Sequence, residues 1–109
     1  MPTDSEIEKQ IIDKGLTAPR IKPEDIDNAI VGEQYHRFEG TNTVVCCLTI
    51  QGGFNTIGHS SCVSDDNFDA DIGKSIARKI AKDQIWMLKG FELSQKIHTE
   101  KKDIERETK

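Results

Sequence analysis

The segment Thr43–Ile50, TVVCCLTI, is the most strand-like stretch of the chain, and the fold can be built outward from it. It is rich in β-branched residues, and apolar side chains fall on both of its faces. The turn residues Gly40-Thr41-Asn42 precede it, and Gly52-Gly53, a hairpin signal, follows it. Residues 34–38 and 54–63 then flank it, which predicts a three-stranded antiparallel meander with the apolar strand in the middle.

Helical periodicity replaces the strand pattern after the sheet. Two neighbouring rows make one apolar face about 100° wide, as a helix packed on a sheet requires: Ile72, Ile76 and Ile80, and beside them Ala77, Ala81, Ile85 and Leu88. The rows predict a long helix over residues 66–97, in which Gly73 allows close packing and Gly90 can interrupt the helix. Residues 98–109 are almost all charged or polar and predict a frayed helical tail.

Two short helices are predicted before the sheet, over residues 4–14 and 24–30, joined by a connector with two prolines. The predicted fold is α+β in a single domain, 1–109: a helical arm at 1–32, the sheet at 33–63, the long helix at 66–97 and the charged tail at 98–109. One helix covers only one face of the sheet, although the central strand is apolar on both. We expect the arm, or more economically a second copy of the chain, to cover the other face.

The composition of the 109 residues argues against several classes of protein. A net charge of −4 is unlike that of a duplex-DNA binder, which usually carries a basic face. No apolar run approaches the roughly 18 residues of a membrane span, and the N-terminus has neither the basic nor the apolar region of a signal peptide. We therefore expect a cytoplasmic protein that binds neither membranes nor duplex nucleic acid.

The segment SDDNFDADIGKS, at residues 64–75, resembles two ligand-binding loops and matches neither. A P-loop requires glycine at the position of Phe68. A calcium loop that starts at Asp65 requires glycine and glutamate where Ala70 and Ile76 stand. The acidic residues instead suit the start of the long helix, where they cap N–H groups and complement the helix dipole, so we predict no metal site.

The histidines and cysteines form no recognisable catalytic constellation. The stretch around His59 lacks the G-x-S-x-G elbow of a hydrolase, and His59 and Cys62 make only one pair at zinc-ligand spacing. Cys46 and Cys47 are neighbours on a strand, so they point to opposite faces and cannot serve one site. We expect reduced thiols that fill the core, no catalytic residue, no cofactor and no enzyme activity.

Several specific segments within residues 6–95 resemble a family of small phage proteins of the N4/Sf6 type. They are GLTAPR at 15–20, the Cys-Cys strand with its Gly-Phe hairpin, NFD at 67–69 and IWMLKG at 85–90. The chain departs from the family pattern with Gly52-Gly53 in place of a single glycine, with His59 where an acid is common, and with KGF at 89–91 where Glu-Gly-Tyr is common. These departures leave the expected fold unchanged and affect the ligand contacts near them.

The family includes the first class of Thoeris anti-defence proteins. In Thoeris, a bacterial anti-phage system, a TIR enzyme converts NAD into a cyclic ADP-ribose isomer that switches on a killing effector. The resemblance implies a sponge in the host cytoplasm that binds this signal tightly without cleaving it. It also implies a homo-oligomer, a dimer or a hexamer, and some members of the family trap cyclic oligonucleotides at a separate site.

A nucleotide sponge requires aromatic faces for adenine, cations for the diphosphate and polar groups for ribose. The expected ligand-binding residues are Phe54 and Phe68 for stacking, Arg20, Lys74 and Arg78 for phosphate, and Asn67 and Asp69 for ribose or adenine edges. Each also has a purely structural alternative: the aromatic residues in the core, Arg20 in a surface salt bridge, the Asn–Asp pair as helix caps, and the two helical cations on a solvated face.

Two other functions compete with the sponge, and a third possibility is a member that binds cyclic oligonucleotides and has lost the ADP-ribose site. The charged tail at 98–109 would suit a protein-interaction module that inhibits a host protein directly. A nucleotide-processing enzyme is the second alternative, and it would return an altered ligand after long incubation.

Overall fold

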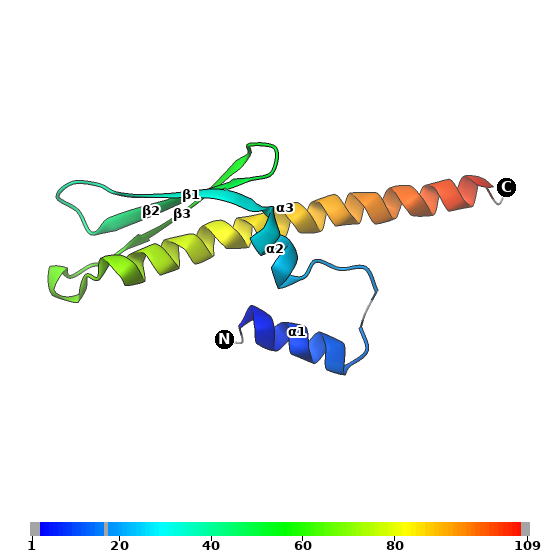
Figure 1. Ribbon diagram of the computed structural model, residues 1–109, viewed down its shortest axis with the longest axis horizontal. Coiled ribbons are helices and arrows are strands. Elements are labelled where there is room, and N and C mark those ends of the chain that lie inside the picture. The colour runs from blue at the N-terminus through cyan, green and yellow to red at the C-terminus, as the bar shows by residue number, and fades with distance from the viewer. Residues whose placement is uncertain (1–2, 17, 108–109) are drawn as a thin grey trace.

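The computed structural model describes residues 3–16 and 18–107, so parts of the predicted arm and tail (1–2, 17 and 108–109) lie outside the described residues. In chain order the elements are α1 (Asp4–Asp13), α2 (Pro23–Ala29), β1 (Ile30–Arg37), β2 (Thr43–Ile50), β3 (Asn55–Ser61), the 3₁₀ turn η1 (Asp65–Asn67) and α3 (Ala70–Glu107) (Figure 1). The α+β fold predicted from the sequence is confirmed: two short helices, a three-stranded antiparallel sheet and a long C-terminal helix packed on it.

The sheet has the order β1-β2-β3, with β2 in the middle as predicted. Cys46 of β2 lies opposite Tyr35 of β1 and Gly58 of β3, which sets the register of all three strands. β1 starts at Ile30, four residues before the predicted strand 34–38, and within the predicted arm. It can do so because the register shifts between Ile30 and Gly32, which lets the chain pass from α2 directly into the sheet.

α3 lies across one face of this sheet (Figure 1). Val44, Cys46 and Leu48 of β2 are buried on that face, and Ala77, Ala81 and Ile85 of α3 are buried with them. The contact is close because β3 has a glycine there. A Cβ atom on Gly58 would overlap the Ala77 carbonyl oxygen and lie 2.9 Å from the Ile80 Cβ. Gly73 is buried in the same row, as expected for a close-packing residue.

The buried face of α3 is narrower than predicted. The row Ile72, Ile76 and Ile80 is exposed at 61%, 47% and 40%, and Leu88 is also exposed, so the prediction that they pack on the sheet is wrong. At Gly58 the close approach of the helix leaves room for the small residues Ala77 and Ala81, and the larger side chains of the neighbouring row remain exposed. We refer to Ile72, Ile76 and Ile80 as the isoleucine ridge.

The ends of α3 also differ from the predicted range of 66–97. Residues Asp65–Asn67 form a separate 3₁₀ turn, and the Asp69 carboxylate starts the helix by accepting from the N–H groups of Asp71 at 2.9 Å and Ile72 at 3.1 Å. At its other end the helix continues through Gly90 without a break and reaches Glu107. The predicted frayed tail is thus regular helix over its described part, and Figure 1 shows this end extending alone beyond the sheet.

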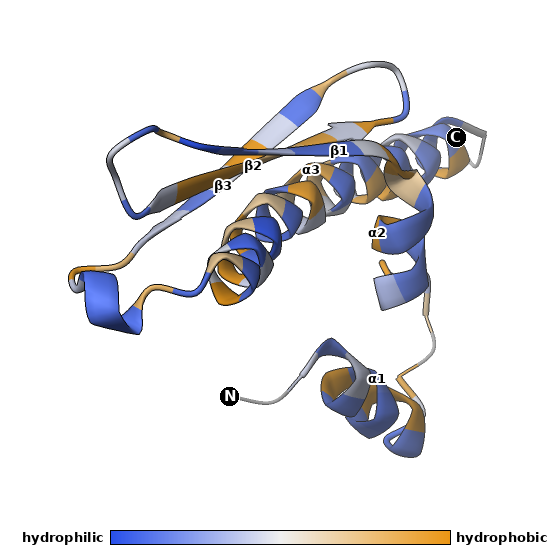
Figure 2. Cartoon of the chain, turned by 60° about the vertical axis from the view of Figure 1, so that its left-hand side comes forward, coloured by the Kyte–Doolittle hydropathy of each residue, from blue (hydrophilic) through white to orange (hydrophobic). Residues whose placement is uncertain are grey.

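The described residues of the arm, 3–16 and 18–32, do not cover the outer face of the sheet. In Figures 1 and 2, α1 lies on the opposite side of α2 and α3 from the sheet. Val45 and Cys47 of β2 point to this outer face and are half-buried between their neighbours. Figure 2 shows β2 as the hydrophobic strand between two more polar ones. The expectation that the arm covers this face is therefore wrong for its described residues.

Candidate ligand-binding site

Three of the predicted ligand-binding residues line the seam between β1 and the start of α3. Alternate residues of β1 point toward α3, and Lys74 and Arg78 lie one turn apart on the facing side of the helix. The residues concerned are Glu33, Tyr35 and Arg37 from β1, Phe68 from the segment after η1, and Lys74 and Arg78 from α3. We refer to these six as the β1–α3 strip.

Arg37 and Phe68 form one end of the strip. The guanidinium carbon of Arg37 lies 4.2 Å from the centre of the half-buried Phe68 ring, within the range of a cation–π contact. Arg37 Nε also donates to the Thr41 carbonyl at 2.8 Å, which fixes the guanidinium. The Asn42 amide donates to the Asp65 carboxylate at 2.5 Å and thereby ties η1, and with it Phe68, to the β1–β2 turn.

Lys74 and Arg78 continue the strip along α3. Lys74 Nζ lies 5.6 Å from the centre of the Tyr35 ring, and Arg78 Nε lies 3.6 Å from Oε2 of Glu33. The Tyr35 hydroxyl donates to the same Glu33 oxygen at 2.6 Å. Among the residues that the structure describes, neither Arg37 nor Lys74 pairs with a carboxylate. The strip therefore has two uncompensated cations at one end and a carboxylate at the other.

Two groups in or beside the strip, the Tyr35 phenol and the Cys46 thiol, have raised pKa values. Partial burial, together with the hydrogen bond to Glu33, raises the pKa of the Tyr35 phenol, which therefore remains a neutral donor at physiological pH. Burial also raises the pKa of the Cys46 thiol, which lies under α3 and is fully buried. Neither group supplies a reactive anion to the strip at neutral pH.

An open hollow adjoins the strip at Arg78. It has a volume of about 440 Å³, within the range of small-molecule sites. Its walls are the start of the arm and the adjacent face of α3: Thr3, Asp4, Ser75, Arg78, Lys79, Lys82 and Asp83. Three of these residues are cations, and Lys82 forms an ion pair with Asp27 of α2 at 2.8 Å. The hollow also has two carboxylates, of which Asp83 pairs with Lys79 at 3.3 Å, so its lining has one more cation than carboxylates. Arg78 thus belongs both to the strip and to this concave surface.

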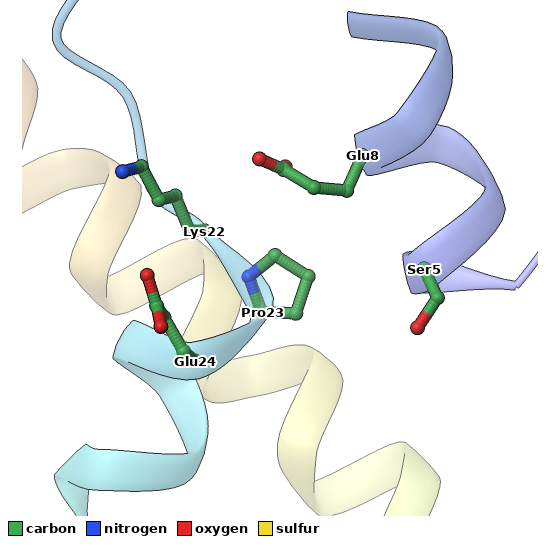
Figure 3. A pocket seen from close by; sticks show the side chains of 5 residues that line it. All are labelled: Ser5, Glu8, Lys22, Pro23 and Glu24. Atoms are coloured by element: carbon green, nitrogen blue, oxygen red, sulfur yellow. The ribbon is translucent and has the colours of Figure 1, made fainter. Parts of the chain in front are cut away.

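A second hollow, of about 320 Å³, lies between α1 and the start of α2 (Figure 3). Figure 3 shows the Glu8 side chain extending from α1 across the gap toward Lys22 and Pro23. Glu8 and Glu24 outnumber the single cation Lys22 in this hollow. It is therefore less suited to an anionic ligand than the surface at Arg78.

The other predicted residues lie partly or wholly outside the strip. Asn67 and Asp69 flank Phe68, but the Asp69 carboxylate is occupied as the cap of α3, in agreement with its structural alternative. Arg20 makes a two-pronged ion pair with Glu8, at 2.6 and 2.7 Å, which is the salt bridge expected as its alternative. Phe54 is 61% exposed in the β2–β3 hairpin, at the opposite end of β3 from Phe68.

Sequence reasoning missed Glu33, Tyr35 and Arg37. Their alternation along one strand was the available signal, but the strand was predicted from residue 34 and its helix-facing side was not assigned. The thiols were predicted more closely. Cys46 and Cys47 lie on opposite faces of β2, and the three cysteines are free. Cys46 is in the core as predicted, whereas Cys47 and Cys62 are only half-buried, so the prediction that they fill the core is wrong. No group of three or more metal-ligating side chains occurs within residues 3–16 and 18–107.

No helix among the described residues has the length and apolarity needed to cross a membrane.

The comparisons with known proteins identify a family. The model of the Phage protein (N4 Gp49/phage Sf6 gene 66) family matches residues 21–97, which include the whole sheet and the entire β1–α3 strip. α1 and the last part of α3 lie outside the matched range. Searches of curated proteins and of solved structures found no significant match.

Proposed function

We propose that this protein, which belongs to the Phage protein (N4 Gp49/phage Sf6 gene 66) family, is a signal sponge that binds a TIR-produced cyclic ADP-ribose isomer. By sequestering this signal without cleaving it, the protein would block Thoeris immunity in the host cytoplasm. The observation that carries the proposal is the pair of cation–aromatic contacts at one end of the strip, Arg37 on Phe68 and Lys74 near Tyr35.

The chemistry of the strip matches the parts of such a ligand. Cyclic ADP-ribose isomers combine a diphosphate with an adenine ring and two riboses. Arg37 and Lys74 lack carboxylate partners within the described part of the chain, so a diphosphate would supply the missing negative charge. The Phe68 and Tyr35 rings offer faces for adenine, and Glu33 offers a hydrogen-bond acceptor for ribose.

Binding without cleavage is consistent with the groups at the site. Cys46 is buried with a raised thiol pKa, and the raised pKa of Tyr35 keeps its phenol protonated. Both side chains are poor nucleophiles in these states. The proposal therefore includes no covalent step and no cofactor.

The proposal includes a homo-oligomer, a dimer or a hexamer. Two apolar surfaces would be covered by a second copy: the outer face of the sheet, with Val45 and Cys47, and the isoleucine ridge on α3. Ile57 of β3 lies beside Cys47 on the outer face and is 55% exposed, which extends that apolar surface. Cyclic oligonucleotides are a further class of ligand to be tested at such an assembly.

The experiment is to identify the ligand that the protein carries out of cells. The full chain is purified from bacteria that express an active Thoeris TIR enzyme, and heat releases the bound molecules for mass spectrometry. We expect an intact cyclic ADP-ribose isomer, absent when the TIR enzyme is inactive. Release of only linear ADP-ribose, or of no nucleotide, would count against the sponge.

A second candidate function is direct inhibition of a host protein. The observation that favours it is the end of α3, which extends alone beyond the sheet and exposes Phe91 at 66% and Ile104 at 60% (Figure 1). If removal of the chain from His98 onward abolishes anti-defence activity in a protein that binds no small molecule, this second function replaces the sponge.

A further inference from the structure

We infer that Glu33 makes the β1–α3 strip selective for anionic ligands that also carry ribose hydroxyls, an inference that rests on the proposed function. Glu33 lies next to the cation Arg78, at the end of the strip away from Phe68. Its Oε2 atom is 3.6 Å from Arg78 Nε and 2.6 Å from the Tyr35 hydroxyl. A carboxylate in this position repels a phosphate that approaches Arg78, and it can accept hydrogen bonds from a hydroxyl pair.

The two contacts of Glu33 differ in strength. The bond from Tyr35 is short and fixes Oε2, whereas 3.6 Å is too long for a hydrogen bond from Arg78. Charge alone therefore holds Arg78, and its side chain is 34% exposed. A ligand phosphate can draw Arg78 away while Glu33 stays in place on Tyr35.

Glu33 also has room for a ligand. Its side chain is 42% exposed, and Oε1 receives no hydrogen bond from the residues that the structure describes. Oε1 is therefore the acceptor available to a hydroxyl group. Carboxylates hold the hydroxyls of ribose in this way in dinucleotide sites.

These properties separate two classes of anion. A bare diphosphate gains contacts with Lys74 and Arg78. It is also repelled by the negative charge of Glu33, and it has no hydroxyl group that could donate a hydrogen bond to this carboxylate. A ribose diphosphate gains the same contacts and in addition donates a charge-assisted hydrogen bond to Oε1. The carboxylate thus weakens the binding of bare diphosphates and preserves the binding of ribose diphosphates.

The test compares inorganic pyrophosphate with ADP-ribose by isothermal titration on the full-length protein. In the Glu33→Gln variant we expect pyrophosphate to bind about fivefold more tightly, because a like charge is removed. We expect the ratio of ADP-ribose affinity to pyrophosphate affinity to fall at least about tenfold, because the hydroxyl bond loses its charged acceptor. Glu33 is at the surface, and thermal unfolding followed by circular dichroism checks that the variant is folded.

Glu92→Gln is the matched control. It makes the same chemical change and the same change in net charge, in an exposed ion pair with Lys89 outside the strip. We expect its affinity ratio to equal that of the wild type. An unchanged ratio in Glu33→Gln, or an equal change in Glu92→Gln, overturns the inference, as does a wild-type protein that binds neither probe.

The outcome separates the two proposals. If the wild type binds a cyclic ADP-ribose isomer but the ratio of ADP-ribose to pyrophosphate affinity is unchanged in Glu33→Gln, only the selectivity inference fails. If the ratio moves as expected while no cyclic isomer binds, the proposed function fails and the selectivity of the strip stands.

Discussion

Gly58 is the residue that sets how closely α3 approaches the sheet. A Cβ atom at this position would overlap the backbone of Ala77 and lie 2.5 Å from the Ala81 backbone nitrogen. Backbone atoms of a helix cannot move aside as the end of a flexible side chain can, so the whole helix would have to shift. The seam between β1 and α3 depends on this distance, because the strip draws side chains from both elements.

We predict that Gly58→Ala destabilises the protein by about 3 kcal/mol or more, at the upper end of overpacking effects. Gly90→Ala is the control, because Gly90 is in the same helix as Ala77 and a Cβ atom there meets nothing within 4 Å. Replacing a helical glycine of this kind stabilises by about 1 kcal/mol. Urea unfolding measures both changes, and equal stabilities for the two variants would contradict this account of the contact.

The Tyr35 phenol provides a second test at the scale of one residue. It is the only tyrosine in the chain, so its ionisation can be followed by ultraviolet absorbance. Because its pKa is raised in the folded state, Tyr35 should stay protonated above pH ~10, where a tyrosine in an unfolded chain ionises. Its contribution to stability is complete below pH ~10 and is lost as the pH rises through the folded-state pKa.

The expected result is a phenol that remains neutral at about pH 10.5 while circular dichroism still reports folded protein. Glu33→Gln should lower this pKa, since the hydrogen bond to the carboxylate is one of its causes. Ordinary titration near pH 10 in the folded wild type would show that Tyr35 is neither buried nor bonded as described.

At the scale of elements, β3 has an exposed edge that α3 partly closes. The Gln84 side chain bonds to both backbone groups of Ile57: it accepts from the N–H at 3.3 Å and donates to the carbonyl at 2.6 Å. A side-chain amide in this position replaces a neighbouring strand and protects the edge from pairing with another chain.

We predict that Gln84→Ala destabilises the protein by about 0.5–1.5 kcal/mol, the net contribution of an ordinary hydrogen bond, because both contacts are exposed and water can replace the amide. It should also promote aggregation through the uncovered edge of β3. Gln95→Ala, an exposed position further along α3, is the control. Thermal unfolding with light scattering measures both effects. A Gln84→Ala protein with wild-type stability and scattering would remove the protective role of this contact.

The position of β2 could be predicted from the sequence, whereas the side of α3 that packs on the sheet could not. β2 and the two hairpin turns follow from local signals, because β-branched residues and turn residues such as glycine act over a few positions. The side of α3 that packs on the sheet did not follow, because two apolar rows were equivalent in periodicity. Only the contact with Gly58, from another element, distinguishes the small-residue row from the isoleucine ridge.

The candidate site shows the same limit. Phe68, Lys74 and Arg78 were identified because they lie in or beside one helix, whereas their partners Glu33, Tyr35 and Arg37 come from a strand more than thirty residues earlier. Pairing across such a distance depends on sheet register and on the position of α3, which local patterns do not encode. Conversely, Arg20 was predicted to reach a phosphate from its extended connector, whereas its ion pair with Glu8 depends on the packing of the arm.

For the whole molecule, the uncovered surfaces predict self-association. We expect Ile76→Lys to weaken the oligomer by at least about tenfold, because it places a charge within the isoleucine ridge without disturbing the buried row. Ser75→Lys, at an exposed polar position on the same helix, is the control. Sedimentation over a range of concentrations measures the change, and a wild-type protein that is monomeric at all concentrations would contradict the proposed assembly.

The most direct test of the account is titration of a cyclic ADP-ribose isomer into the full-length protein, with recovery of the ligand afterwards. We expect measurable heat at micromolar protein and unaltered ligand after denaturation. We also expect at least about tenfold weaker binding by Arg37→Ala, from the loss of a charge-assisted contact, and no change for Lys102→Ala on the exposed end of α3. The absence of heat, a hydrolysed product, or equal binding by all three proteins would overturn the proposed sponge function.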